Sequence, residues 1–272
     1  MSKVWFITGT SKGFGREFAL AALGRGDMVA ATARDVASLT DLVERYGDAV
    51  LPIQLDVTDR AQVFAAVKAA HDTFGRLDVV INNAGYGLFG AVEEITEQQL
   101  REQLETNLFG VFHVTQAVLP MLREQQSGHI IQISTIGGIL AFPGLGGYHA
   151  SKWALEGLTD SLTQEVASFG IKVTLVEPGG FDTDWSSASA VVADALPEYA
   201  RLHEAMAARW TGSAGPKPVG FGSAILKVVD AETPPKRLFF GQQPTQIVPD
   251  FYQQRLEEWA AWAPVSREAE GK

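Results

Sequence analysis

The chain has 272 residues, of which 46% are hydrophobic, contains no cysteine and carries a formal net charge of −10 at pH 7. The absence of cysteine excludes disulfides, thiolate zinc sites and cysteine nucleophiles, and the acidic charge argues against non-specific nucleic-acid binding, which needs a basic surface. No run of about eighteen apolar residues is present, and the first apolar stretch is too short for a signal peptide, so we expect no membrane span and a cytoplasmic protein.

Short runs rich in valine and isoleucine alternate with amphipathic helical stretches along most of the chain. We predict strands at Val4–Thr8, Met28–Ala33, Val50–Leu55, Val79–Asn82, Ile130–Ser134, Lys172–Val176 and, as a seventh, Arg237–Phe240. We predict helices near residues 14–25, 36–46, 59–74, 96–126 and 148–168. Each strand is almost continuously apolar, as in a parallel sheet covered on both faces. The alternation therefore predicts an α/β fold with a doubly wound sheet, and we expect residues 1–272 to form a single domain.

The alternation stops between Gly179 and about Pro218. This stretch follows the end of a strand, where open α/β sheets bind their ligands, and it sets aromatic residues among Gly, Ser and Asp. We interpret residues 180–217 as a substrate lid; the alternative is an additional packing helix.

The C-terminal segment, residues 249–272, is predicted to hold one short helix from Pro249 to Pro264, followed by a frayed end from Arg267. Its apolar residues would serve core packing or a subunit interface; they are Phe251, Leu256, Trp259 and Trp262.

A glycine-rich loop, Thr8-Gly9-Thr10-Ser11-Lys12-Gly13-Phe14-Gly15, lies between the first predicted strand and the first predicted helix. In this setting Gly9 permits a tight turn, while Gly13 and Gly15 allow the backbone to approach a pyrophosphate. The helix N-terminus adds free N–H groups and a positive dipole. We therefore predict a dinucleotide phosphate site, because the alternative, a plain turn, does not need three glycines.

A second pattern, Tyr148-x-x-x-Lys152, lies downstream of Ser134. Residues four apart on a helix share a face, so Lys152 is expected one turn from the Tyr148 phenol. A neighbouring ammonium favours the phenolate and lowers the phenol pKa from its reference of about 10. The alternative is a helix that buries Tyr148 at an edge and leaves Lys152 in solvent.

Together these motifs resemble the short-chain dehydrogenase/reductase family, whose single-domain branch carries Thr-Gly-x-x-x-Gly-x-Gly and Tyr-x-x-x-Lys. The matching residues occur in the family's order from residue 8 to residue 183: the glycine loop, Asn82-Asn83-Ala84-Gly85, Asn107, Ser134, Tyr148 with Lys152, and Pro178-Gly179 with Thr183. Phe14 departs from the family's frequent Ile, and the region after residue 185 matches no motif. The resemblance implies a Rossmann-type fold and a nicotinamide cofactor.

The resemblance also implies a role for each catalytic candidate. Tyr148 would donate the proton in carbonyl reduction and accept it in alcohol oxidation, and Ser134 would donate a hydrogen bond to the carbonyl oxygen. Lys152 would hold the nicotinamide ribose, and Asn107 would support a water that links Lys152 to solvent. The alternatives are an ordinary strand-end hydroxyl for Ser134 and a backbone-bonded side chain for Asn107.

The cofactor contacts implied by the resemblance include Asp56 and Val57 near adenine, although Asp56 could merely lie beside a helix cap at Thr58 or Asp59. Asn82-Asn83 could likewise be an ordinary turn. The full expected set is Gly9, Ser11, Lys12, Gly13, Phe14, Gly15, Arg34, Asp56, Val57, Asn83, Ala84, Gly85, Tyr148, Lys152, Pro178, Gly179, Phe181 and Thr183.

The end of the second strand bears on the choice between the two nicotinamide cofactors. In similar proteins an acid at the position of Ala33 selects NAD, and a base at the position of Arg34 selects NADP. The forked donors of Arg34 suit a 2′-phosphate, and Lys12 adds a second cation. Asp35 is the contrary signal. We expect NADP(H) in preference to NAD(H).

The residues expected to border the substrate are mostly apolar or aromatic: Leu140, Phe142, Pro143, Trp185, Tyr199 and Met206. They favour a bulky hydrophobic ketone or secondary alcohol. A 3-oxoacyl thioester is an alternative substrate, although the acidic chain lacks an evident basic patch for an acidic carrier protein. A catalytically silent dinucleotide-binding sensor or scaffold is the alternative function.

The resemblance implies a homodimer or homotetramer that pairs through the helices near 96–126 and 148–168. Gln103, Phe109, Trp153 and Leu158 are candidates for that interface. The five histidines are scattered with no i, i+4 pair, so we expect no metal site.

Overall fold

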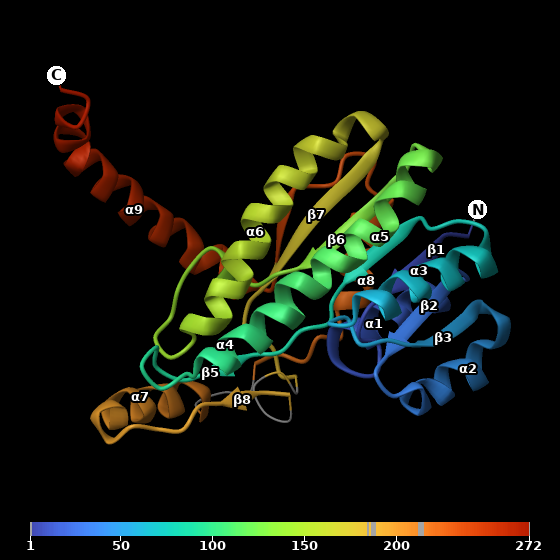
Figure 1. Ribbon diagram of the computed structural model, residues 1–272, viewed down its shortest axis with the longest axis horizontal. Helices are drawn as coiled ribbons and strands as arrows, with labels where there is room; N and C mark the ends of the chain where they lie inside the picture. Colours follow the sequence, from blue (N-terminus) through green and yellow to red (C-terminus); the bar gives the residue numbers. More distant parts are fainter. Residues whose placement is uncertain (1, 184, 186–188, 212–214, 272) are drawn as a thin grey trace.

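A seven-stranded parallel sheet forms the centre of the protein (Figure 1). The computed structural model describes residues 2–183, 185, 189–211 and 215–271. The strand order is β3-β2-β1-β4-β6-β7-β9. The strands are β1 Val4–Ile7, β2 Met28–Ala33, β3 Val50–Gln54, β4 Val79–Asn82, β6 Gly128–Ile133, β7 Ile171–Pro178 and β9 Arg237–Phe240. All seven predicted strands and the doubly wound Rossmann-type fold are confirmed.

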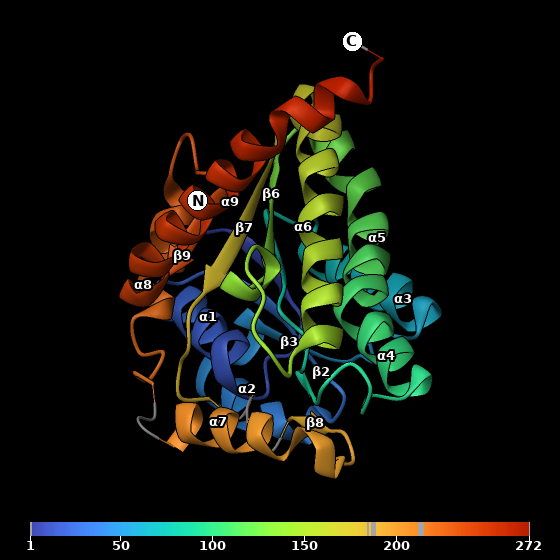
Figure 2. The ribbon, with the colours of Figure 1, turned by 90° about the vertical axis from the view of Figure 1, so that its left-hand side faces the viewer.

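Helices cover both faces of the sheet (Figures 1 and 2). One face packs against α1 Gly13–Gly24, α2 Thr40–Tyr46 and α8 Phe221–Asp230. The other packs against α3 Arg60–Phe74, α5 Gly110–Gln125 and α6 Gly146–Val166. Because successive strand residues point to opposite faces, Trp5 joins the first core cluster and Phe6 the second.

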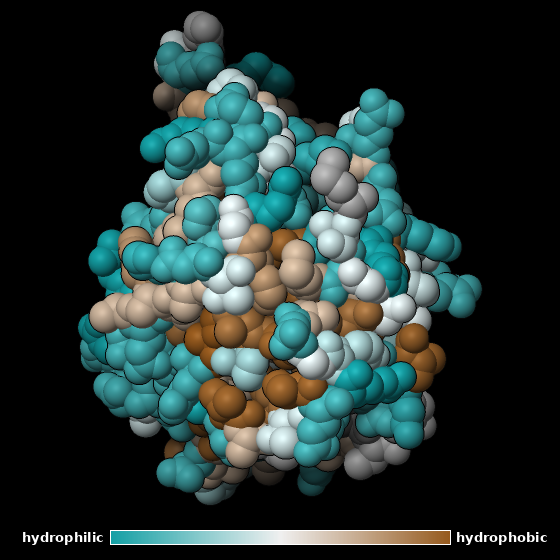
Figure 3. Space-filling model, turned by 90° about the vertical axis from the view of Figure 1, so that its right-hand side faces the viewer, coloured by the Kyte–Doolittle hydropathy of each residue, from teal (hydrophilic) through white to brown (hydrophobic). Residues whose placement is uncertain are grey.

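Strand β3 forms one edge of the sheet and contains Pro52, which lies beside Ala31 of β2. A proline on an edge strand lacks an N–H for pairing with another chain. Figure 3 shows the side of the molecule that carries this edge, where apolar side chains gather in the middle of a largely hydrophilic surface. Leu51 and Ile53 of β3 are partly buried.

The long helix predicted over residues 96–126 is interrupted. It consists of α4 Glu97–Leu104, a π-helical turn at Glu105–Phe109, and α5. The turn contains Asn107, whose side chain is fully buried. Such π-helical turns are frequent at functional sites.

Helix α8 and the two-residue strands β5 Leu88–Phe89 and β8 Val191–Val192 were not among the predicted elements. The signal for α8 is present, because its buried residues have helical spacing: Phe221, Ile225, Val228 and Val229. Strands β5 and β8 are too short to leave a periodic pattern. They pair in parallel and tie the segment after residue 189 to the body.

The prediction for the C-terminal helix is wrong in its bounds and in part of its packing. Helix α9 spans Gln242–Glu268 and contains Pro249 and Pro264, because each proline removes one hydrogen bond without ending the helix. Its first turns pack on the body through Val248 and Phe251. Its second half extends away from the body (Figure 1), so the predicted anchors Leu256, Trp259 and Trp262 are exposed by 53%, 63% and 63%.

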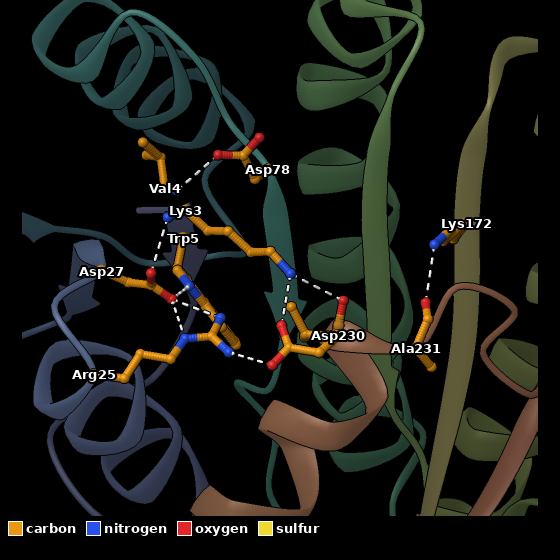
Figure 4. A network of polar contacts seen from close by, with 10 residues as sticks. Lys3, Val4, Trp5, Arg25, Asp27, Asp78, Lys172, Asp230 and Ala231 are labelled. Atoms are coloured by element: carbon orange, nitrogen blue, oxygen red, sulfur yellow. Dashed lines mark hydrogen bonds and ion pairs between the residues drawn. The ribbon is translucent and has the colours of Figure 1, made fainter. Parts of the chain in front are cut away.

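A network of ion pairs lies at the end of the sheet where the strands begin (Figure 4). Asp27 is buried and accepts hydrogen bonds from Trp5 Nε1 at 2.8 Å, Arg25 Nε at 2.7 Å and the Lys3 backbone N–H at 2.9 Å. Asp230 joins the network through Lys3 and Arg25. These contacts tie β1, β2 and α8 together at the end away from the site described below.

Replacing Asp27 with Ala is expected to lower the free energy of unfolding by about 2–4 kcal/mol, because it leaves the buried Trp5 donor and Arg25 without their acceptor. The matched control is Asp72→Ala, which removes an exposed pair with Lys68 on α3 and is expected to change stability by less than about 0.5 kcal/mol. Chemical denaturation of both variants measures the difference. Equal, small effects would contradict a stabilising role for the network.

Candidate active site

Three positions of the glycine loop require glycine, two for their backbone angles and one for lack of space. Gly9 has a φ of +70° and Gly13 a φ of +60°, which only glycine adopts readily. At Gly15 a Cβ would lie 2.2 Å from the Gly9 carbonyl oxygen and 2.5 Å from Asn83 Nδ2. Helix α1 begins at Gly13, and its N-cap residue, Lys12, forms no capping bond through its side chain. A tight backbone turn at such a helix N-terminus fits a dinucleotide phosphate.

Asn83 directly follows strand β4 and supports the glycine loop through hydrogen bonds. Its Nδ2 donates to the backbone oxygens of Thr8 at 2.9 Å and Gly9 at 3.0 Å. Thr8 Oγ1 in turn accepts the backbone N–H groups of Asn83 and Ala84 at 2.9 and 3.0 Å. Asn83 and Ala84, predicted as cofactor residues, thus shape the cradle through the loop backbone.

The two acidic residues considered near the cofactor, Asp35 and Asp56, accept hydrogen bonds from residues of their own turns. Asp35 Oδ1 accepts a hydrogen bond from the Ala37 backbone N–H and caps the following 3₁₀ turn. Of the two residues before it, Ala33 is buried and Arg34 is exposed. Asp56 Oδ1 accepts from the Thr58 backbone N–H at 3.0 Å and from its hydroxyl at 2.7 Å. The cap of α3 is Asp59.

The remaining cofactor candidates lie at the carboxyl ends of the strands and next to α1. Ser11, Lys12 and Gly85 are exposed, and Val57 and Pro178 are buried. Phe14 stacks on Phe221 with ring centroids 4.2 Å apart, and Phe181 meets Phe221 edge-on at 4.7 Å. The Gly179 N–H donates to the Phe240 oxygen, and Thr183 Oγ1 accepts the Trp185 N–H.

Tyr148 is 6% exposed and packs among apolar residues. Its ring centroid lies 4.9 Å from that of Trp185. Burial raises the pKa of Tyr148 above its ordinary value, and a hydrogen bond with the Thr135 side chain opposes this only in part. The lowering of the Tyr148 pKa predicted from Lys152 is therefore wrong in direction for this structure, because loss of solvation is the larger effect.

Lys152 is buried on the same face of α6, one turn after Tyr148, so the predicted alternative of a solvent-exposed Lys152 is wrong. Its Nζ donates to the Ile133 backbone oxygen at 2.8 Å. Burial lowers the pKa of Lys152 to about 8, while the charge of Glu156 raises it.

Asn107 lies between Lys152 and the loop after β4. Its Oδ1 accepts the Tyr86 N–H at 3.1 Å, and its Nδ2 donates to the Tyr86 oxygen at 3.0 Å and to Ser151 Oγ at 3.1 Å. A Cβ on Gly85 would lie 3.0 Å from Asn107 Oδ1 and 3.8 Å from Lys152 Nζ. Gln103 also donates to the Tyr86 oxygen and is fully buried. The prediction of Gln103 at a subunit surface is therefore wrong.

Ser134 follows strand β6 and is 4% exposed. Its backbone N–H donates to the Val176 oxygen of β7 at 2.8 Å, which fixes its position at the carboxyl end of the sheet. Its Oγ forms no hydrogen bond of ordinary geometry within the described part of the chain. Ser134 is thus a buried hydroxyl with a proton to donate.

Three of the predicted substrate residues surround Tyr148, namely Phe142, Trp185 and Met206. Phe89, Leu145 and Ala190 complete this apolar cluster and were not predicted, because they belong to loops and to a strand of two residues. Trp185 lies against Gly87, where a Cβ would come within 2.6 Å of its ring, and Met206 lies against Gly144.

The other three substrate predictions differ from the structure. Leu140 is 1% exposed and packs with Val248 and Phe251 of α9, so it belongs to a separate core cluster. The Tyr199 hydroxyl donates to Glu93 Oε2 at 2.8 Å and lies outside the cluster around Tyr148. Pro143 is exposed on the loop before α6. These three residues lie outside the cluster around Tyr148, and their contact with a substrate stays a prediction.

The segment predicted as a lid lies across the carboxyl end of the sheet and includes β8 and α7 Ala200–Thr211 (Figure 2). Residues 184, 186–188 and 212–214 of this prediction lie outside the described residues. Glu94 ties the segment down: its Oε1 accepts from the Leu196 N–H at 2.8 Å and pairs with His203 Nε2 at 2.7 Å. The segment therefore has fixed attachments to the body.

His149, to which the sequence analysis assigned no role, holds the loop between β6 and α6. Its Nε2 accepts the Phe142 N–H at 2.9 Å, so its Nδ1 carries the proton that it donates to the Gly137 oxygen at 2.8 Å. Burial lowers the pKa of His149. The uncharged His149 ring thus holds the backbone of this loop in place at Gly137 and Phe142.

Within the described residues, no helix has both the length and the apolar character needed to cross a membrane, and no three His, Asp or Glu side chains gather as metal ligands would.

A family model described as short chain dehydrogenase matches residues 3–191. Over 245 residues the chain is 49% identical to the oxidoreductase BOA17 of Botryotinia fuckeliana, with 89% of each chain covered. It is 37% identical over 245 residues to a 3-ketodihydrosphingosine reductase of Bacteroides thetaiotaomicron, with 88% of each covered.

Solved structures of dehydrogenases superpose on this chain. A short-chain dehydrogenase from Streptomyces avermitilis superposes with a TM-score of 0.92 at 39% identity over 98% of both chains. A Burkholderia phymatum member in complex with NAD gives 0.76 at 25% identity over 88% of each chain. An alcohol dehydrogenase from Thermococcus sibiricus complexed with 5-hydroxy-NADP gives 0.74 at 27% identity over 88% of this chain and 96% of that one.

The chain belongs to the short-chain dehydrogenase family. It is an oxidoreductase, and its neighbours with bound NAD or NADP support a nicotinamide dinucleotide as its cofactor.

Proposed function

We propose that the protein is an NADP(H)-dependent carbonyl reductase and secondary alcohol dehydrogenase with Tyr148 as its proton donor and acceptor. The observation that carries this proposal is the position of Tyr148: it is buried in an apolar cluster, one helical turn from a buried Lys152, at the end of the sheet that holds the glycine loop.

The chemistry divides among four side chains. When bound, the nicotinamide supplies or takes up the hydride. Tyr148 Oη gives its proton to the oxygen that gains negative charge, and Ser134 Oγ donates a hydrogen bond to that oxygen. Lys152 holds the ribose hydroxyls and carries a positive charge near Tyr148. Asn107 supports the water through which the proton is replaced.

Burial raises the pKa of Tyr148, so the phenol keeps its proton at neutral pH. Tyr148 therefore holds the proton that carbonyl reduction requires, whereas alcohol oxidation requires the phenolate and gains as the pH rises.

The surroundings of Tyr148 support a bulky hydrophobic ketone as the substrate. Its cluster consists of aromatic and aliphatic side chains, which gain by removing apolar substrate surface from water. The name of the Bacteroides relative, 3-ketodihydrosphingosine reductase, also indicates a ketone as the substrate of that protein. We propose that residues 180–217 act as a lid over this substrate, because Trp185 and Met206 reach the Tyr148 cluster from it.

NADP(H) is proposed over NAD(H) because of the groups at the end of β2. Arg34 is exposed there, and the competing acid Asp35 is occupied in capping a turn. An exposed guanidinium can form a bidentate pair with a 2′-phosphate.

Replacing Arg34 with Ala is expected to lower kcat/KM for NADPH by about 10- to 100-fold, because a hydrogen bond between charged groups is lost. The kcat/KM for NADH should stay within about 2-fold. The control is Arg45→Ala, which removes an exposed arginine that stacks on Tyr46 and should leave both values unchanged. A wild-type preference for NADH would contradict the proposed cofactor.

We also propose that the protein is a homo-oligomer. Phe109 and Trp153 are exposed by 43% and 38% on the helices named in the sequence analysis, and α9 exposes Trp259 and Trp262. Exposed aromatic residues of this kind are typical of subunit interfaces. Sedimentation equilibrium measures the state, and a monomer at micromolar concentration would contradict the proposal.

The proposed function is tested by NADPH oxidation across a panel of hydrophobic ketones and a 3-oxoacyl thioester. Turnover of the ketones is expected. Turnover of the thioester alone would replace the substrate class. Tight cofactor binding without turnover of any compound would indicate a sensor or scaffold.

A further inference from the structure

A buried acidic cluster lies beside Ser134. Glu156 of α6 is 5% exposed and Glu177 of β7 is 0% exposed. Arg237 of β9 is the cation between them: its Nε lies 3.1 Å from Glu156 Oε2 and 3.3 Å from Glu177 Oε1. Its Nη2 also pairs with the half-exposed Asp160 at 2.7 Å. Arg237 thus forms ion pairs with three carboxyl groups, two of which are buried.

This cluster favours a bound proton. Arg237 is shared among three carboxyl groups and the buried Lys152 acts on Glu156, yet burial still raises the pKa of Glu156 and of Glu177, because a charged carboxylate is costly in a medium of low polarity. Two carboxyl groups in one site therefore hold one proton between them more tightly than either would alone. Both Glu177 oxygens and Glu156 Oε1 form no hydrogen bond of ordinary geometry within the described residues.

The cluster reaches the proposed catalytic hydroxyl. A Cβ placed on Gly138 would lie 2.6 Å from Ser134 Oγ and 3.0 Å from Glu156 Oε1, so both oxygens approach the same point. Residues Tyr148, Lys152 and Glu156 follow at intervals of four on α6, so Glu156 extends the catalytic face of the helix by one turn. Ser134 pairs through its backbone with Val176, the neighbour of Glu177.

We propose that Glu156 is a positioning residue for Ser134: the one proton that the Glu156–Glu177 pair retains lies on Glu156, the Glu156 carboxyl group donates it in a hydrogen bond to Ser134 Oγ, and the Ser134 hydroxyl donates its own proton to the carbonyl oxygen of the substrate. When the pair loses that proton, the Glu156 carboxylate accepts the Ser134 proton instead, and the hydrogen bond to the substrate is lost. This inference rests on the proposed function of Ser134.

The surroundings support protonation near neutral pH. Burial raises the pKa of Glu177 to about 8, helped by the charge of Glu156 and opposed by Arg237. Burial also raises the pKa of Glu156. A side-chain hydrogen bond with Ser134 and the charge of Arg237 lower that pKa and oppose the effect of burial. The other ionisable groups that act on the cluster are Asp160 and Lys152 of α6, and Tyr252 with Arg255 of α9.

The sign of the pH dependence follows. As the pH rises above neutrality and Glu156 loses its proton, the donor to Ser134 is lost and kcat/KM for ketone reduction falls. Lys152, with a pKa of about 8, also loses its charge in this range. The two causes respond oppositely to the removal of the Glu156 charge, because that charge raises the Lys152 pKa.

Glu156→Gln separates them. The amide that this substitution introduces donates to Ser134 Oγ at every pH, so kcat at pH 7 should stay within about 3-fold of the wild type, and kcat/KM at about pH 10 should exceed that of the wild type by about 10- to 100-fold. If Lys152 alone sets the alkaline fall, its lower pKa in the variant leaves the variant no more active than the wild type at any pH. That result overturns the proposal. Glu156→Leu, which cannot donate, should lower kcat by about 10- to 100-fold.

Two further variants show whether the effect passes through Ser134. In a Ser134→Ala background, Glu156→Gln should no longer raise kcat/KM at about pH 10; a persisting gain would overturn the proposal. Asp160→Asn, at the exposed end of the cluster, should move the profile by less than about 0.3 pH unit.

An infrared titration is independent of turnover. The protonated carboxyl band is expected to disappear around pH 8 in the wild type and to be absent from a Glu156→Gln, Glu177→Gln double variant. A wild type without this band holds no shared proton, and the proposal fails even if ketones are reduced. A wild type with the band but without ketone turnover shows that the proposed function has failed instead.

Discussion

Replacing Tyr148 with Phe is expected to lower kcat for ketone reduction by about 10³-fold or more, because the variant keeps the ring in its apolar cluster and loses only the proton donor. The Kd for NADPH should stay within about 2-fold, since the hydroxyl is a small part of the cofactor contact. Steady-state kinetics and a fluorescence titration with NADPH measure the two quantities.

The control for this variant is Tyr46→Phe, which removes a hydroxyl at the end of α2 and should leave kcat unchanged. Near-normal turnover by Tyr148→Phe would show that another group supplies the proton. A parallel loss of NADPH binding would show that the substitution disturbs the pocket rather than the chemistry.

Replacing Gly15 with Ala is expected to weaken NADPH binding by at least about 10-fold and to destabilise the fold by about 1–3 kcal/mol. The new Cβ would meet the Gly9 carbonyl oxygen at 2.2 Å, so the turn that cradles the phosphates has to move. Isothermal titration with NADPH and thermal denaturation measure both effects.

The same helix supplies the control. Gly24 lies at the end of α1, where a Cβ would meet nothing within 4 Å. Gly24→Ala should therefore bind NADPH normally and be as stable as the wild type or slightly more so, since alanine favours the helix. Similar affinity losses in both variants would contradict a specific role for the loop.

The fold was predictable because buried parallel strands leave a strong pattern. Runs such as Val79–Asn82 and Ile130–Ser134 are apolar on both faces, and every predicted strand pairs in the sheet. The order of motifs also placed Asn107, Ser134, Tyr148 and Lys152 at one end of it. Their buried positions follow from helix periodicity and from strand ends, which sequence patterns describe well.

Other features depend on contacts that a linear pattern does not contain. Leu140 and Phe142 are both hydrophobic and two residues apart, yet Leu140 packs in the cluster under α9, whereas Phe142 contacts that cluster and also the one around Tyr148. Proline is a common helix boundary, but α9 continues through Pro249. The Tyr148 pKa was predicted from its charged neighbour, while burial decides its direction.

The sequence pattern also did not predict that Glu156 and Glu177 lie together beside Ser134. Glu156 lies on the same helical face as Tyr148 and Lys152, but its charge favours an exposed position, and Glu177 lies in an apolar strand. Only the register of β7 beside β6, with Arg237 added from β9, brings them to Ser134. A carboxylate inside a buried strand is nevertheless a signal, because such a group needs a partner.

The most direct measurement of the central claim is the transfer of deuterium from NADPH labelled at the nicotinamide C4 to a hydrophobic ketone. We predict that the wild type places the label on the carbinol carbon of the product and that Tyr148→Phe does so at a rate lower by about 10³-fold. Absence of label from the product, with NADPH bound and every ketone unchanged, would contradict the account.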